Sequence, residues 1–155
     1  KRISPTDTAT SDSEIQDVTL PQLLLEHFDG KSALEFATKH PDRLRVPGAT
    51  AFAAVDSGVV HEGVLFLFQV TVQRDGHKVF APHLLEYIKA WKKAHGKLRE
   101  CRLVFVVPPE CSPKYAREQK LTDKPSNFDE ELSSIGVPLS QWRYVFDIQG
   151  LLKKV

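Results

Sequence analysis

The residues of this chain that are best suited to chemistry are Asp56, Gln69 and Thr71. Side chains alternate along a β-strand, so Gln69 and Thr71, two positions apart in the apolar run 64–72, point to the same side. Asp56 follows the preceding apolar stretch, 49–55. Polar side chains inside a buried strand either find hydrogen-bond partners or line a site. The spacing therefore predicts that an acid and a polar pair on neighbouring strands form a site.

Metal-dependent hydrolysis of a phosphodiester needs oxygen ligands for magnesium and a group that orients or activates water. In nucleases of the PD-(D/E)xK type, an Asp ends one strand, and an acid or Gln lies two positions before a Lys on the next. We expect Asp56 and Gln69 to bind Mg²⁺ and Thr71 to position water. Gln69 is a weaker ligand than a carboxylate, and Thr71 lacks the positive charge of the lysine.

Each of these residues also has an alternative, structural role. Asp56 is suited to cap a turn at residues 57–58, because Asp side chains bond to nearby backbone groups. Gln69 is suited to bond an adjacent loop, and Thr71 has the β-branched side chain that strands favour. The spacing alone leaves both interpretations open.

Four lysines on or just beyond an expected helix at 82–95 form a candidate phosphate-contacting surface. They lie away from the apolar stripe of that helix, and they are Lys89, Lys92, Lys93 and Lys97. Contacts from such lysines to DNA would be independent of base sequence and sensitive to salt. The alternative is an ordinary solvated helix face.

Three histidines are expected near the turns of the sheet, namely His61, His77 and His83. Surface or capping roles are the default for them, because no HxxxH or HExxH spacing indicates zinc. Glu62 would replace a missing acid only if it faced the site. Cys101 and Cys111 have no zinc or disulfide spacing and predict free thiols.

Apolar periodicity and turn residues divide the chain into segments. We expect helices at 19–29, 32–40 and 82–95, and shorter helical pieces near 112–119 and 127–134. We expect strands at 64–72, 102–107 and 141–148, and a strand or short helix at 49–55, with a turn at 57–58. Because helices alternate with buried strands, the pattern predicts an α/β domain with a central sheet flanked by helices. The helix at 82–95 should connect two parallel strands.

Composition limits the domain organisation and the partners. The chain has 155 residues, 41% of them hydrophobic, which predicts one domain at 19–155 after a polar, flexible lead-in at 1–18. Its net charge of +1 gives no global electrostatic preference, so a nucleic acid would need a local basic patch. No apolar run is long enough to span a membrane, so no membrane partner is expected. The chain starts at Lys1 and contains no methionine, so we expect a fragment of a larger protein.

Several of these motifs resemble the carboxyl-terminal region of Crinkler effectors and the related retrotransposon hot spot proteins. The segments Ala53-Ala54-Val55-Asp56 and Phe68-Gln69-Val70-Thr71 match the family's paired strands, and His77 lies in its turn. The strand end at 103–109 and the aromatic strand at 144–148 are also similar. The resemblance covers roughly residues 49–148. The sequence departs from the active-nuclease pattern at Thr71, where a lysine is expected, and at Lys78, where the family often has proline.

This resemblance implies a mixed central sheet of the restriction-endonuclease-like, PD-(D/E)xK type. It also implies an upstream NTPase or ubiquitin-like header domain in the same parent protein. Such proteins act inside cells, often in the nucleus and often as effectors in a host. We therefore expect a nuclease-fold effector domain that acts on or near nucleic acid, with Mg²⁺ as cofactor if it is active. The alternatives are a catalytically degenerate module that binds DNA or a host or partner protein, and a module that only supports the neighbouring NTPase domain.

Overall fold

The computed structural model describes residues 24–28, 36–37, 40–47 and 54–146. Six strands form one mixed sheet in the order β1-β2-β3-β4-β6-β8. Their bounds are Leu24–Phe28 for β1, Arg43–Pro47 for β2, Ser57–His61 for β3, Val64–Val70 for β4, Glu100–Val107 for β6 and Leu139–Val145 for β8. The pairs β2–β3 and β3–β4 are antiparallel, whereas the pairs β1–β2, β4–β6 and β6–β8 are parallel. The expected mixed α/β sheet is confirmed.

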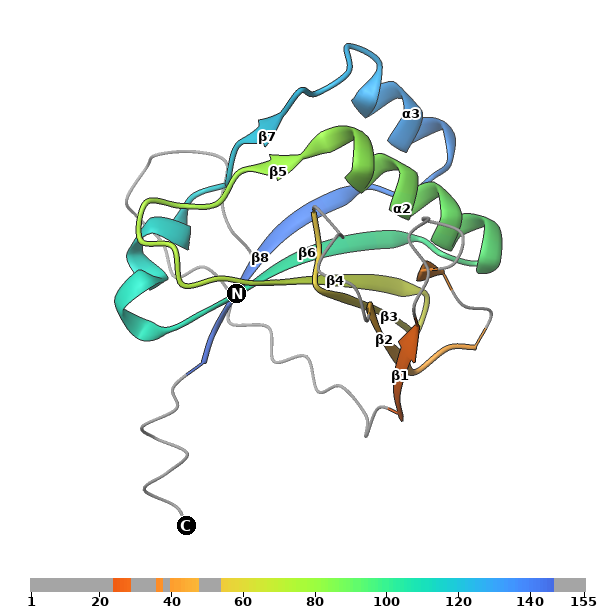
Figure 1. Cartoon of the computed structure of the whole chain (residues 1–155). Helices are drawn as coiled ribbons and strands as arrows, with labels where there is room; N and C mark the ends of the chain where they lie inside the picture. The colour runs from red at the N-terminus through yellow and green to blue at the C-terminus, as the bar shows by residue number, and fades with distance from the viewer. Residues whose placement is uncertain (1–23, 29–35, 38–39, 48–53, 147–155) are drawn as a thin grey trace.

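The helix between β4 and β6 makes the parallel crossover that the sequence predicts. Helix α2 (Ala81–Ala94) has Pro82 in its first turn and buries an apolar stripe that includes Leu84, Ile88 and Trp91. This stripe packs against the side of β4 and β6 that carries Leu67, Phe105 and their neighbours, forming the larger core. Helix α3 (Phe128–Ser134) contributes to the same core, and Figure 1 shows α2 and α3 on the same side of the sheet.

The opposite face of the sheet has an apolar cluster of its own. Val59, Phe66, Val104 and Trp142 are buried there, from strands β3, β4, β6 and β8. Strand β4 is therefore apolar on both faces, as its sequence predicts. The α-helices α2 and α3 nevertheless both lie over the first face (Figure 1).

Short elements fill the connection from β6 to β8. The 3₁₀-helix η1 (Pro109–Ala116) follows β6, close to the helical piece expected at 112–119. A two-residue strand β7 (Leu121–Thr122) then pairs in parallel with β5 (Val79–Phe80), which leads into α2. The pairing ties the segment after β4 to the segment after η1, above the carboxyl ends of β4 and β6 (Figure 1).

The amino-terminal third differs from the sequence-based expectations. A helix was expected at 19–29, but residues 24–28 form strand β1, which pairs in parallel with β2. The leucine spacing favoured a helix, but Glu26 forms ion pairs with Arg43 and Arg45 of β2, and such tertiary contacts override local propensity. The rest of that expected helix, the lead-in at 1–18, most of the segments 32–40 and 49–55, and residues 147–155 lie outside the described residues.

The start of β3 also corrects an expectation. Residues 57–58 were expected to form a turn after a strand that Asp56 ends, but Ser57 and Gly58 are the first two residues of β3. Asp56 therefore precedes a strand. Among the described residues, no helix is both long enough and apolar enough to cross a membrane.

Candidate active site

Asp56 and Gln69 meet at the point where β3 begins and β4 ends. The antiparallel register pairs Ser57 with Phe68, so the next pair outward is Asp56 with Gln69. The backbone N–H of Asp56 donates to the carbonyl of Phe68 at 2.7 Å, which extends the ladder by one bond. The side-chain Nε2 of Gln69 donates to Oδ2 of Asp56 at 2.9 Å. The structure therefore brings together two of the three residues that the sequence singled out.

The Asp56 carboxylate is fixed at one oxygen. Oδ2 accepts the Gln69 amide and also the backbone N–H of Val70, at 2.6 Å. Within the described residues, Oδ1 makes no hydrogen bond, and the Asp56 side chain is exposed. Gln69, in contrast, is only 8% exposed. The pair thus combines a buried amide with an exposed carboxylate, one oxygen of which makes no hydrogen bond to the described residues.

Thr71 lies just beyond the end of β4 and is bound to its own loop. Its hydroxyl accepts the backbone N–H of Gln73 at 3.2 Å, a local turn bond that Thr residues commonly make. Burial raises the pKa of Tyr115, and a hydrogen bond with the Thr71 side chain opposes that shift. The Thr71 hydroxyl is therefore engaged with Gln73 and Tyr115.

His77 is a site residue whose role the sequence did not reveal. It follows β4 in the loop that leads to β5, and its ring lies 6.5 Å, between centroids, from that of Phe105. Phe105 is the register partner of Gln69 on β6, so His77 lies over the end of the strand that carries Gln69. Burial lowers the pKa of His77, and the negative charge of Asp56 opposes that shift. The imidazole and the carboxylate are therefore within electrostatic reach of each other.

The His77 loop is anchored by a pair of buried glutamines. The backbone N–H of His77 donates to Oε1 of Gln119 at 3.0 Å, and Nε2 of Gln119 donates to the carbonyls of Lys114 and Arg117. The backbone of Gln119 is in turn bonded by both ends of the Gln141 amide, from β8. These bonds hold the loop against the carboxyl end of the sheet.

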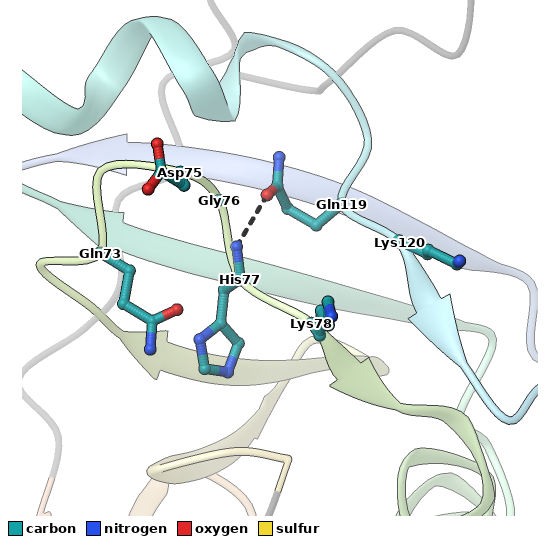
Figure 2. Close-up of a pocket in the computed structure, with 7 residues that line it drawn as sticks. All are labelled: Gln73, Asp75, Gly76, His77, Lys78, Gln119 and Lys120. Atoms are coloured by element: carbon teal, nitrogen blue, oxygen red, sulfur yellow. Dashed lines mark hydrogen bonds between the residues drawn. The ribbon is translucent and has the colours of Figure 1, made fainter.

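An open pocket of about 470 Å³ lies beside this loop. Figure 2 shows its lining residues, which are Gln73, Asp75, Gly76, His77, Lys78, Gln119 and Lys120. The imidazole of His77 extends from the loop to the same side as the Gln73 side chain (Figure 2). Asp56 and Gln69 do not line the pocket, so His77 is the residue that connects the pocket to the Asp56–Gln69 pair.

Two exposed lysines stand together at the rim of this pocket. The β5–β7 register pairs Val79 with Leu121, so Lys78 and Lys120 are neighbours one position before. The backbone N–H of Val79 also donates to the carbonyl of Lys120. The two lysines give the rim of the pocket positive charge, although Asp75 lines the pocket as well.

The four lysines expected to contact phosphates lie at the other end of the sheet. Lys89 forms an ion pair with Glu131 of α3 at 2.7 Å, and Lys92 donates to the carbonyls of Gly96 and Leu98, beyond the carboxyl end of α2. Lys93 and Lys97 are exposed. The backbone N–H of Arg99, after α2, donates to the carbonyl of Gly63 in the β3–β4 turn. The residues 64–68 of β4 lie between that turn and Gln69, which places the two about 20 Å apart.

The other residues considered for the site lie elsewhere. Nδ1 of His61 is 2.8 Å from Oδ1 of Asp42, beside the β3–β4 turn. Glu62 is in that turn, with a positive φ of 48°, and so does not replace a missing acid beside Gln69. His83 packs on Phe80 in the first turn of α2. Cys101 and Cys111 are both buried free thiols, as expected.

Among the described residues, no three His, Cys, Asp or Glu side chains gather in an arrangement that would hold a metal ion. Gln69, whose amide oxygen is also a possible metal ligand, lies between Asp56 and Phe105 in this part of the sheet. Comparison of the chain with protein-family models, with curated protein sequences and with solved structures gave no match. The chemistry of the site therefore has to be argued from its own geometry.

Proposed function

We propose that this chain is a restriction-endonuclease-like domain that acts on nucleic acid and hydrolyses phosphodiester bonds with a divalent metal ion. The observation that carries the proposal is the direct contact between Asp56 and Gln69, at the end of the sheet where β3 begins and β4 ends. The PD-(D/E)xK chemistry requires such a convergence of an acid with a second polar ligand from the adjacent strand.

The topology supports this assignment. The antiparallel run β2-β3-β4 is followed by α2 and by the parallel strand β6. This connection leaves the residue before β3 and the last residues of β4 at the same end of the sheet. The carboxyl ends of β4 and β6 are also where the loops that form the pocket begin. Ligands of open α/β sheets commonly bind at the carboxyl ends of the strands.

The donor atoms fit a hard cation after one small rearrangement. Gln69 now directs Nε2 at Asp56, and a half-turn of its terminal amide would place Oε1 at the same position, 2.9 Å from Oδ2. Two oxygens bound to one Mg²⁺ at about 2.1 Å and at right angles are about 3.0 Å apart. The separation therefore suits a shared cation, and the amide hydrogen bond keeps the pair in place without one.

The chain's own residues have distinct parts in this proposal. Asp56 and Gln69 hold the ion, and a bound divalent ion polarises the phosphoryl oxygen and activates water. Lys78 and Lys120 bind the phosphates of the nucleic acid at the pocket rim. Thr71 is better suited to hold the loop than to position water, because its hydroxyl accepts from Gln73. On the resemblance alone, we also propose action in the nucleus and an upstream NTPase or ubiquitin-like header.

One observation favours a second function, a nuclease fold that binds DNA or a partner protein without cutting. The position expected to carry a lysine is Thr71, whose hydroxyl is used inside its own loop. Among the described residues, no lysine bonds to Asp56, whose carboxylate is bound by Gln69 and Val70. A domain without that lysine would keep the sheet as a scaffold for binding but would not hydrolyse phosphodiester bonds.

A cleavage assay separates the two functions. Plasmid DNA, single-stranded DNA and RNA are incubated with the protein in Mg²⁺ or Mn²⁺, and cutting is followed on gels. Asp56→Asn should abolish cutting, because it keeps an acceptor for Gln69 and Val70 but removes the charge that holds the ion. Asp129→Asn, in α3, is the matched control and should cut like the wild type. DNA binding without any cutting would establish the non-catalytic function.

A further inference from the structure

The ring nitrogen Nδ1 of His77 is buried without a hydrogen-bond partner among the described residues. Buried side-chain nitrogens nearly always have a partner, whether protein, water or ion, because leaving one unpaired costs free energy. A ligand that the imidazole binds would account for this atom.

The groups around His77 indicate which kind of ligand its imidazole would bind. The ring lies against Phe105, next to Gln69 across the β4–β6 register, and the negative charge of Asp56 acts on the pKa of His77. Asp56 has an oxygen that makes no hydrogen bond to the described residues, and Gln69 supplies an amide. The three side chains come from three separate segments, namely the residue before β3, the end of β4 and the β4–β5 loop.

The backbone of His77 is held firmly enough for a ligand role. Its N–H is fixed by Gln119, and Gly76 precedes it with a φ of +91°, which side chains other than glycine rarely allow. A Cβ at Gly76 would also lie 2.6 Å from Oε1 of Gln119. The loop thus packs directly on the glutamine that positions His77. Sites that bind metal ions depend on this kind of support around their ligands.

From these observations we infer that His77 is the third protein ligand of the metal site, together with Asp56 and Gln69. This inference rests on the metal site of the proposed function, and it adds the ligand set and the class of ion. A nitrogen ligand beside two oxygens shifts preference from magnesium toward divalent ions of the first transition row. The site therefore takes such an ion, and Mn²⁺ is the probe because it is paramagnetic.

The test measures coordination rather than activity. Mn²⁺ is added to the full chain, its affinity is measured by the loss of the free-ion EPR signal, and pulsed EPR detects nitrogen bound directly to manganese. The wild type should show ¹⁴N modulation, which changes to that of ¹⁵N in protein grown with ¹⁵N-histidine. His77→Gln should lose the modulation and bind Mn²⁺ at least about tenfold more weakly.

His95→Gln is the matched control. His95 also has a buried ring nitrogen without a partner among the described residues, but it stacks on Trp91 at the far end of α2. This variant should keep both the nitrogen signal and the affinity. The isotope exchange needs no substitution and tests whether a histidine binds the ion, and His77→Ala is the second variant that assigns the signal to His77 if His77→Gln fails to fold.

The possible outcomes are all decisive. Bound Mn²⁺ without nitrogen modulation, or an unchanged His77→Gln variant, would show that His77 is not a ligand. Absence of Mn²⁺ binding would overturn both the ligand set and the proposed metal site. A nitrogen-coordinated Mn²⁺ in a protein that cuts no nucleic acid would support the inference while contradicting the proposed hydrolysis.

Discussion

The side-chain carbonyl of Gln119 accepts the backbone N–H of His77 at 3.0 Å and joins two segments 42 residues apart. The same amide donates through Nε2 to two carbonyls after η1, those of Lys114 and Arg117. One buried side chain therefore satisfies three backbone groups and fixes the loop that carries His77. The shape of the pocket and the position of the imidazole both depend on it.

Gln119→Ala should destabilise the domain and loosen the His77 loop. It leaves up to three backbone groups without partners, and each lost hydrogen bond costs about 1 kcal/mol, so we expect a loss of roughly 2–3 kcal/mol. Urea unfolding measures this loss, and hydrogen exchange at the His77 amide reports the loop. Gln73→Ala is the control, because its exposed side chain lines the same pocket, and it should change stability by less than about 0.5 kcal/mol. Equal effects of the two variants would contradict the anchoring role of Gln119.

Gly76→Ala should be destabilising for a different reason. Its positive φ of 91° strains any side chain, and a Cβ would approach Oε1 of Gln119 to 2.6 Å. We expect a loss of about 1–3 kcal/mol in thermal or urea unfolding. Gly96→Ala makes the same chemical change after α2, where a Cβ would meet nothing within 4 Å. It should be close to neutral, and a similar loss at both glycines would show that the loop tolerates the change at Gly76.

The sequence predicts the central elements of the fold because their signals are local. Strand β4 is a continuous apolar run, and α2 combines a helical apolar period with Pro82 at its start. Strand β1 is missed because its leucines are spaced as in a helix, and the contacts that make it a strand come from Arg43 and Arg45. Pairing between distant segments is not encoded in any local period.

The sequence also predicts only part of the candidate site. The two-residue spacing of a polar pair on a strand and a preceding acid are enough to bring Asp56 and Gln69 together. The expected role of Thr71 depends on the turn after β4, where its hydroxyl binds Gln73. His77 is recognisable only in three dimensions, because its burial comes from Phe105 and its anchor from Gln119.

Stability should fall in alkaline solution because of Cys101. Burial raises the pKa of this thiol well above its ordinary value of 9.0, and the charge of Glu100 acts in the same direction. Above pH 9 the unfolded chain releases a proton that the folded chain keeps, so the free energy of unfolding falls as the pH rises, by up to about 1.4 kcal/mol per pH unit. Urea unfolding between pH 8 and about 10 measures the slope. Burial also raises the pKa of Tyr87, from 10.0 to about 12, so tyrosine contributes only at higher pH.

Cys101→Ala is the control for this pH dependence. The variant loses the thiol, so the part of the slope between pH 9 and 10 that comes from Cys101 should disappear, whatever its overall stability. A wild-type slope that Cys101→Ala leaves unchanged would assign the effect to another group.

The two pairs of exposed lysines at opposite ends of the sheet predict different effects on DNA binding. Lys78 and Lys120 stand at the rim of the pocket beside His77, whereas Lys93 and Lys97 lie near the β3–β4 turn, about 20 Å from Gln69. If the nucleic acid binds at the pocket, the double variant Lys78→Ala/Lys120→Ala should weaken binding. Each lost phosphate contact on duplex DNA should reduce the slope of log affinity against log salt by about 0.9.

Fluorescence anisotropy over a series of KCl concentrations measures that slope. The double variant Lys93→Ala/Lys97→Ala removes the same charge and is the matched control, with an expected slope close to the wild type. The reverse result would place the nucleic acid on the lysine face of α2, which the sequence first indicated, and would separate binding from the Asp56–Gln69 pair. Equal, small effects of both variants would mean that neither lysine pair contacts phosphate. The partner would then have to be recognised by other means, as in the protein-binding alternative.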